Sequence, residues 1–280
     1  MVKLNNLISP KPKIIVSSHK IKNHIMPNKY VDFISDDHLI KCISELYTKY
    51  LNAKTSYTKK DFNKNKVDVF KMLFDKKFNN LDDEDLIEKE ISRQVDRTIV
   101  NAIGDFHENI LNGVDGYSKV PVGIDIKSDN NKVFIELKNK HNTVKGEDKK
   151  SIFTKLKGEI DKNPNSKAYF ARMLDKKSTN KQWIFSHKGT EYNDENILII
   201  SGDQLYKIVT GKDNALFQLY QNLPQAIDDL LATISDEQKS DNVENTAMKE
   251  FTTDIEKSKR SIIDEITFSN YSYYLGFDEL

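Results

Sequence analysis

Cysteine is nearly absent from this chain of 280 residues, which holds only Cys42. A single cysteine excludes an internal disulfide and any zinc site built on a cysteine cluster, and it fits a reducing cytoplasm. No apolar run approaches the length of a membrane span, so we expect no membrane association. Glycine-rich loops of the forms GxxxxGK[ST] and GxGxxG are also missing, which leaves nucleotide binding unsupported.

Arginine is scarce beside lysine, and the formal net charge is zero. The charged residues are nevertheless distributed unevenly along the sequence. Residues 1–30 contain six lysines and no acid, the stretch 127–159 is mildly basic, and acids outnumber bases after residue 225. A basic face is what a polyanionic partner requires, so neutrality overall does not argue against such a partner. The four arginines are Arg93, Arg97, Arg172 and Arg260.

A short stretch in the middle of the chain, residues 122–143, has the pattern of a β-hairpin. Apolar and polar residues alternate over 122–127 and again over 133–138, and the polar residues 128–131 lie between them. Alternation bounded by Asp, Asn and Ser is typical of a half-buried hairpin.

Three charged residues of this hairpin fall on one face. Glu136 and Lys138 are two apart on a strand and project to the same side. The turn places Asp125 opposite Phe134 if its centre lies between positions 129 and 130, or opposite Glu136 if it lies one residue later. Both registers bring the two acids within roughly 5–8 Å. Two carboxylates at that distance can share a hard divalent cation, beside which the amine of Lys138 can sit.

A simpler interpretation is that these charges merely solvate the open face of a hairpin. Two details favour chemistry instead. Aspartate is a poor strand former, yet Asp125 stands between two isoleucines, and its face also carries the Glu-x-Lys pair.

The remaining pattern predicts helices around a mixed sheet. Helical spacing predicts helices over 36–52, 67–78, 82–111 and 149–159, with a loop over 53–66. The helix 82–111 carries Glu108 near its end, which is either a plain surface carboxylate or, since the chain returns to Val122 within a short loop, a residue that reaches the hairpin's metal site. A strand over 167–174 completes a strand–helix–strand unit, which implies a parallel pair. Further strands are expected at 183–185 and 197–200, and Pro224 is expected to break the helix over 215–231.

Three regions follow from this pattern. We expect an N-terminal arm and helical region over 1–80, a core over 81–235, and a C-terminal helical extension over 236–280.

The elements together resemble the PD-(D/E)XK nuclease superfamily. Its core is a helix bearing an acid, then a hairpin with Asp and Glu-x-Lys, then a helix and a strand. The matching residues here are Glu108, Asp125 and Glu136-Leu137-Lys138, although the proline before the aspartate is missing. The segments FHENILNG, GIDIK and FIELKNKHNT are similar to type II restriction endonucleases that cut GGNCC or GGWCC sites. The similarity is strongest over residues 99–160.

The resemblance implies an α/β fold with a mixed sheet and Mg²⁺-dependent hydrolysis of phosphodiester bonds in double-stranded DNA. Asp125, Glu136 and the carbonyl of Leu137 would hold Mg²⁺, Lys138 would orient or activate a water, and Glu108 would assist. It also implies a homodimer that matches a two-fold DNA site, with a cognate DNA methyltransferase as companion.

Two other functions stay open at this point, namely a structure-selective or repair nuclease of the same superfamily and a non-catalytic DNA-binding module. For DNA contacts we expect two segments. The first directly follows the Glu-x-Lys strand and would position the backbone. The second is the polar loop 175–182, which is expected either to reach base edges or to be a solvated loop without a role in binding. Their candidate residues are Asn139, Lys140, His141 and Asn142 in the first segment, and Lys181 and Gln182 in the second.

Overall fold

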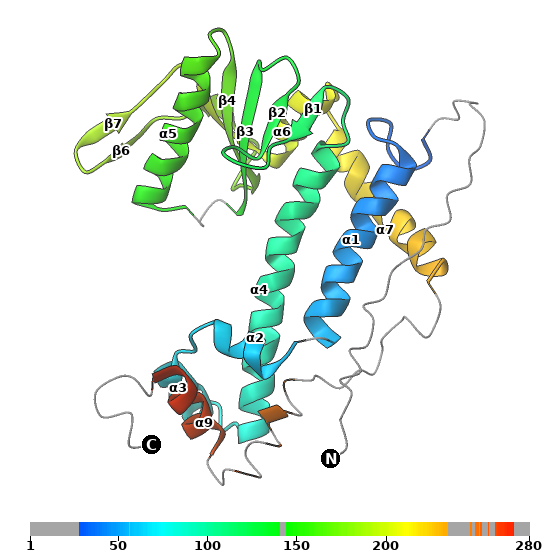
Figure 1. The fold of residues 1–280 in the computed structure, drawn as a ribbon. Helices are drawn as coiled ribbons and strands as arrows, with labels where there is room; N and C mark the ends of the chain where they lie inside the picture. Colours follow the sequence, from blue (N-terminus) through cyan, green and yellow to red (C-terminus); the bar gives the residue numbers. More distant parts are fainter. Residues whose placement is uncertain are drawn as a thin grey trace, which may run out of the picture.

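A mixed six-stranded sheet forms the centre of the protein, seen here in a computed structural model that describes residues 28–55, 57–140, 144–234, 247, 250, 251, 253, 257 and 261–271. The strand order is β1-β2-β3-β4-β8-β5 (Figure 1). The pairs β3–β4 and β4–β8 are parallel, and the other neighbours are antiparallel, which confirms the predicted mixed sheet. The strands are β1 Tyr117–Lys119, β2 Ile126–Ser128, β3 Val133–Lys140, β4 Lys167–Leu174, β5 Asn180–Gln182 and β8 Ile197–Ser201, and a separate hairpin joins β6 Phe185–His187 to β7 Thr190–Tyr192.

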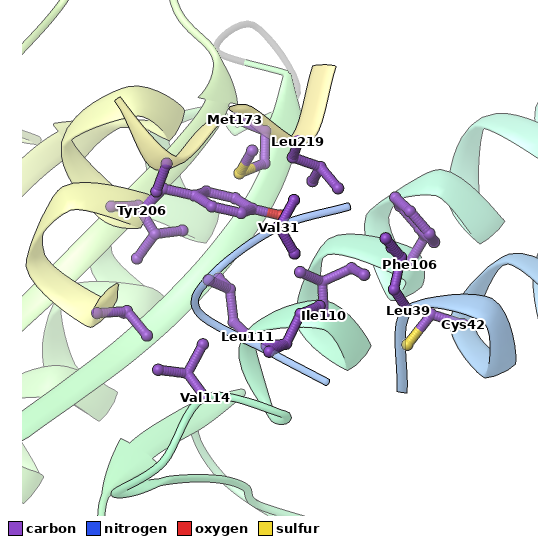
Figure 2. Close-up of a cluster of buried hydrophobic side chains, with 14 of the residues drawn as sticks. Val31, Leu39, Cys42, Phe106, Ile110, Leu111, Val114, Met173, Tyr206 and Leu219 are labelled. Carbon is purple, nitrogen blue, oxygen red and sulfur yellow. The ribbon is translucent and has the colours of Figure 1, made fainter. Parts of the chain in front are cut away.

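Helices cover both faces of this sheet. One face packs against α5, and the other packs against a group of four helices. Figure 2 shows part of that second core, where Phe106 and Ile110 of one helix lie near Leu39 of another and Tyr206 is fully buried. The predicted strand–helix–strand unit β3–α5–β4 is confirmed. The bounds are α5 Gly146–Lys162, α1 Asp36–Thr55, α4 Asp83–Leu111, α6 Gly202–Thr210 and α7 Ala215–Ala232.

Strand β3 is buried on both faces, not on one as the sequence predicted. Phe134 points into the core under α5, whereas Ile135 and Leu137 point into the core under the four helices. Glu136 is only 3% exposed and lies on the α5 side. The expected half-buried hairpin is therefore wrong, because α5 covers the face that carries the charges.

The first arm of the hairpin is also shorter than predicted. Residues 122–125 form bends, and β2 begins at Ile126. Val122 is 84% exposed, and Gly123 has a φ of +103°, a conformation that glycine adopts readily. Asp125 consequently lies just before the strand, at the point where the chain turns into the sheet.

A second group of helices forms what we call the helical lobe, at the far end of α4 from the sheet (Figure 1). Its own core contains Phe62, Met72 and Ile87, all nearly fully buried. Helix α4 has 29 residues and spans about 44 Å, so it joins this lobe to the sheet. The lobe consists of α2 Lys59–Lys64, α3 Val69–Phe78, the beginning of α4, and α9 Ile262–Tyr271.

The loop expected over 53–66 is wrong, because it contains the end of α1 and the whole of α2. A capping box begins α2: the Thr58 hydroxyl accepts from the Asp61 backbone, and the Asp61 carboxylate accepts from the Thr58 backbone. Phe62, with no exposed surface, anchors the short helix in the core of the helical lobe.

Three further expectations are corrected near the C-terminal half. Residues 180–182 form the edge strand β5 and not the end of a loop, and the strand predicted at 183–185 begins instead at Phe185. Helix α7 runs through Pro224 without a break. Within the described residues, no helix combines the length and the apolar character that crossing a membrane requires.

Candidate active site

Asp125 and Glu136 face each other at the end of the β2–β3 hairpin. The observed pairs are Ile126 with Ile135 and Lys127 with Phe134, which continue to Asp125 opposite Glu136. This is the second of the two registers that the sequence allowed. The Asp125 carboxylate also accepts a hydrogen bond of 2.6 Å from the backbone N–H of Leu137, which fixes its position beside β3.

Two lysines hold the buried carboxylate of Glu136. Lys138 donates to its Oε1 at 2.8 Å, and Lys155 of α5 donates to its Oε2 at 2.8 Å. Lys138 also donates to the carbonyl oxygen of Leu137 at 3.1 Å. The Glu136 charge is thereby paired on both oxygens, as a buried carboxylate requires.

Glu108 of α4 belongs to the same electrostatic environment. It forms an ion pair of 2.8 Å with Lys119 at the end of β1, and its side chain is 15% exposed. Its negative charge contributes to raising the pKa of both Asp125 and Lys138. Of the four residues that the sequence assigned to catalysis, the structure therefore brings Asp125, Glu136 and Lys138 together, and it places Glu108 near enough for its charge to act on Asp125 and Lys138.

The pKa values of this cluster are shifted by burial and by neighbouring charges. Burial raises the pKa of Asp125 to about 6, and the charges of Glu136 and Glu108 act in the same direction. Burial disfavours the charged form of Lys138, but its hydrogen bond to Glu136 and the surrounding acids raise its pKa above the usual value. Lys138 is therefore an ammonium at neutral pH in the metal-free protein.

We expect the Asp125 carboxyl to titrate near pH 6 in the metal-free protein, measurable by its ¹³C chemical shift. Glu108→Gln should lower that pKa, because it removes a negative neighbour and leaves the Lys119 ammonium without its acidic partner. The folded pKa lies above the reference value of 3.8, so the proton on Asp125 stabilises the fold below that value and the stabilisation is lost as the pH rises through about 6. An unchanged midpoint in Glu108→Gln would place Glu108 outside the cluster.

The oxygen atoms of the cluster suit a hard divalent cation. The carboxylates of Asp125 and Glu136 and the carbonyl of Leu137 are the donor types that Mg²⁺ binds. The Lys138 ammonium contacts two of these three groups, so the site already attracts positive charge. Among the described residues no set of three or more His, Cys, Asp or Glu is grouped for a metal, so the Leu137 carbonyl is the further protein donor beside the two carboxylates.

Comparison with known proteins agrees with this geometry. Over residues 31–232 the chain matches the Eco47II restriction endonuclease family. It is 42% identical over 218 residues to the type II restriction enzyme Sau96I of Staphylococcus aureus, an alignment that covers 74% of this chain and 84% of that enzyme. The type II restriction enzyme Eco47II of Escherichia coli is 33% identical over 217 residues, which cover 72% of this chain and 88% of the relative. The chain belongs to the Eco47II restriction endonuclease family.

The chain is accordingly a type II restriction endonuclease, a site-specific deoxyribonuclease. This confirms the resemblance to type II restriction endonucleases that the sequence predicted. This assignment replaces the two other functions that the sequence left open, a structure-selective or repair nuclease and a non-catalytic DNA-binding module.

The DNA-contact candidates of this restriction endonuclease fall in two separate places. Asn139 lies at the end of β3, where its amide donates to the carbonyl oxygen of Val100 on α4 at 3.3 Å, and Lys140 is the last residue of that strand. His141 and Asn142 lie outside the described residues. Lys181 and Gln182 are on β5, an exposed strand at the opposite edge of the sheet from β1.

Two lysines of the candidate active site were not predicted from the sequence. Lys155 reaches Glu136 from α5, and Lys119 reaches Glu108 from β1. A signal for Lys155 was present, because it stands between Ile152 and Leu156 on the buried side of the helix. Lys119 had no such signal, because β1 is a strand of three residues with no alternating pattern.

Proposed function

We propose that this restriction endonuclease hydrolyses phosphodiester bonds at a short palindromic, GGNCC-like site in duplex DNA, with Mg²⁺ as its cofactor and Asp125, Glu136, Lys138 and Glu108 at its active site. The single observation that carries the proposal is the buried Glu136 carboxylate, which lies opposite Asp125 and beside the Lys138 ammonium. Type II restriction endonucleases generally use a divalent metal ion, and the oxygen donors here fit one.

Each residue has a distinct role in this proposal. Asp125, Glu136 and the Leu137 carbonyl would hold the ion. When bound, a divalent ion supplies Lewis-acid chemistry, which makes hydroxide available near neutral pH and offsets charge on the phosphate. Lys138, as an ammonium, orients the attacking water and neutralises the phosphate that it faces. Lys155 positions Glu136 by holding its second oxygen.

The DNA contacts are proposed for two segments. Asn139, Lys140, His141 and Asn142 would position the backbone near the cut, because β3 leads from Lys138 directly into them. Lys181 and Gln182 are the candidates for base edges, although Gln182 is engaged with Asn193 at 2.5 Å. A base contact should relax specificity at one position, whereas a backbone contact weakens binding to all sequences alike.

Digestion of long duplex DNA tests the function directly. We expect discrete fragments in Mg²⁺ whose ends map to one GGNCC-like sequence. In Ca²⁺, which coordinates oxygen but accepts looser geometry, we expect sequence-specific binding without efficient cutting. Fragments with ends at unrelated sequences, or at structural junctions only, would refute the proposal. We further propose that the enzyme acts in the cytoplasm together with a DNA methyltransferase of the same specificity.

We also propose a homodimer, because a two-fold DNA site is matched by a two-fold protein. An exposed apolar stripe on α3 supports a second copy as its partner. Phe70, Phe74 and Phe78 recur every four residues and are 58%, 58% and 80% exposed. Monomeric proteins rarely expose such a contiguous patch, and a helical stripe can pack against its own copy around a two-fold axis.

Phe74→Asp should therefore shift the sedimenting species from dimer to monomer. A charge placed in the centre of the stripe would be desolvated in the dimer interface but hydrated in the monomer. Phe217→Asp is the matched control, because Phe217 is also exposed, at 57%, on the distant helix α7. A wild-type monomer on its cognate DNA, or a Phe74→Asp protein that stays dimeric, would remove this stripe from the interface.

A further inference from the structure

A basic hollow lies on the helical lobe, away from the active site. It has a volume of about 400 Å³ and lies between α4 and the segment that joins α2 to α3. Two of the four arginines in the whole chain line this one hollow. Its lining contains five basic side chains against the two acids Asp68 and Glu90: Lys64, Lys66, Lys71, Arg93 and Arg97.

Arg93 is held in place by a buried polar network. Its guanidinium forms a two-pronged pair with the Glu90 carboxylate, through Nε at 2.7 Å and through Nη2. The Glu90 side chain is 8% exposed, and it also accepts from Gln94 at 3.0 Å, while Gln94 accepts from Tyr57 at 2.5 Å. The Arg93 side chain is nevertheless 46% exposed. A cation that is fixed by buried groups and open on its other edge loses little entropy when it binds an anion.

Arg97 lies one helical turn farther along α4 and is exposed. Within the part of the chain that the structure describes, its guanidinium forms no ion pair or hydrogen bond. Its charge therefore contributes nothing to the stability of the lobe through a partner of its own. Beside Arg93 it adds a second guanidinium, the group best suited to phosphate through its planar fork of donors.

The geometry of α4 relates this hollow to the active site. Arg97 and Glu108 are eleven positions apart on one uninterrupted helix. Eleven residues make three turns with a remainder of only about 20°, so both side chains lie on the same face of the helix, about 16 Å apart along its axis. In Figure 1, α5 and α3 lie on the same side of α4, at its two ends. Along a duplex that runs parallel to α4, that separation equals about five base pairs of B-form DNA.

We propose that the hollow binds the sugar-phosphate backbone of the duplex about five base pairs from the scissile bond, through Arg97 and Arg93. The inference rests on the proposed active site only for that separation. The contact carries no sequence information, because backbone phosphates are the same at every site. It adds length to the DNA that the enzyme recognises without adding bases to the recognition sequence.

Binding of Arg97→Ala to duplexes with long and short flanks tests the proposal. Dissociation constants are measured in Ca²⁺ on duplexes that extend at least ten, or only two, base pairs beyond the cut. On long duplexes, cognate or not, we expect about a tenfold loss of affinity and a salt dependence reduced by roughly one phosphate contact. On short duplexes, which end before the hollow, wild type and variant should bind equally. Arg97→Glu should enlarge the loss on long duplexes only.

Lys162→Ala is the matched control. Lys162 is a 71% exposed cation at the end of α5, by the amino ends of β3 and β4, so its loss should change neither affinity nor salt dependence. Unfolding temperatures should be unchanged, because Arg97 forms no ion pair or hydrogen bond with the described residues of the lobe.

The proposal is overturned if Arg97→Ala binds long duplexes like wild type, or if its loss is the same on short ones. Its failure and that of the proposed active site are distinguishable. Arg97→Ala saturated with DNA should cleave at the wild-type rate, whereas active-site variants should bind long duplexes but fail to cleave them.

Discussion

Replacing Glu136 with glutamine should reduce the cleavage of duplex DNA by at least about 10³-fold, a loss of the size expected when a site loses an essential charge. Glutamine keeps the shape of a side chain that is only 3% exposed, so the protein should fold. It removes the negative charge that Lys138 and Lys155 both contact and that a divalent ion would require. Single-turnover cleavage at saturating enzyme measures the effect without contributions from DNA binding.

Glu159→Gln is the matched control for this change. Glu159 lies on α5 like Lys155, pairs with Lys162 at 3.1 Å, and among the described residues forms no hydrogen bond or ion pair with the hairpin. We expect it to cleave like wild type. Near-normal cutting by Glu136→Gln in Mg²⁺ would remove Glu136 from the catalytic site, whatever its contacts.

Lys138→Met is the second change with a large expected effect, a loss of about 10²–10³-fold in the same assay. Methionine retains the apolar stem but has no ammonium to orient water or to neutralise the phosphate. Removing this charge should also raise the pKa of Asp125 further, because Lys138 lowers it. Cleavage by the variant should therefore begin to fall at a higher pH than cleavage by wild type.

Lys155→Met tests whether the loss in Lys138→Met comes from a specific role of Lys138 or only from the loss of a positive charge beside Glu136. Lys155 contacts the other oxygen of Glu136 and, unlike Lys138, donates no hydrogen bond to the Leu137 carbonyl. Because Lys155 only positions Glu136, its replacement by methionine should reduce the cleavage rate about tenfold. Equal losses for the two lysines would indicate that only the total charge around Glu136 matters, which would contradict a specific role for Lys138.

The grouping of Asp125, Glu136 and Lys138 was predictable from sequence because their spacing places them on one face in either hairpin register. The register itself was not predictable, because both turns are built from Asp and Asn. The structure selects the later turn centre, with Asn131 at a φ of +53° and its N–H bonded to Ser128. Asparagine tolerates that conformation at either position, so its presence alone did not decide.

Contacts between distant elements could not be predicted in the same way. Strand β5 has the sequence NKQ, which lacks any apolar pattern, and it exists because β8 offers an open edge. The burial of Glu136 depends on how α5 crosses the sheet, which the periodicity of α5 alone does not specify. The continuity of α7 through Pro224 likewise depends on its packing, since proline in isolation favours a break.

Helix α4 fixes both the distance and the rotational orientation between the helical lobe and the active site. It runs without interruption from the helical lobe to Glu108, so a one-residue insertion between Arg97 and Glu108 would rotate one against the other by about 100° and lengthen the span by about 1.5 Å. The rotation would turn the basic hollow away from the DNA that the active site holds. Insertions of four or seven residues would nearly restore the phase while moving the distal contact by about two or three base pairs. The reach of the enzyme along DNA is thus set in steps of a helical turn, independently of the chemistry at the hairpin.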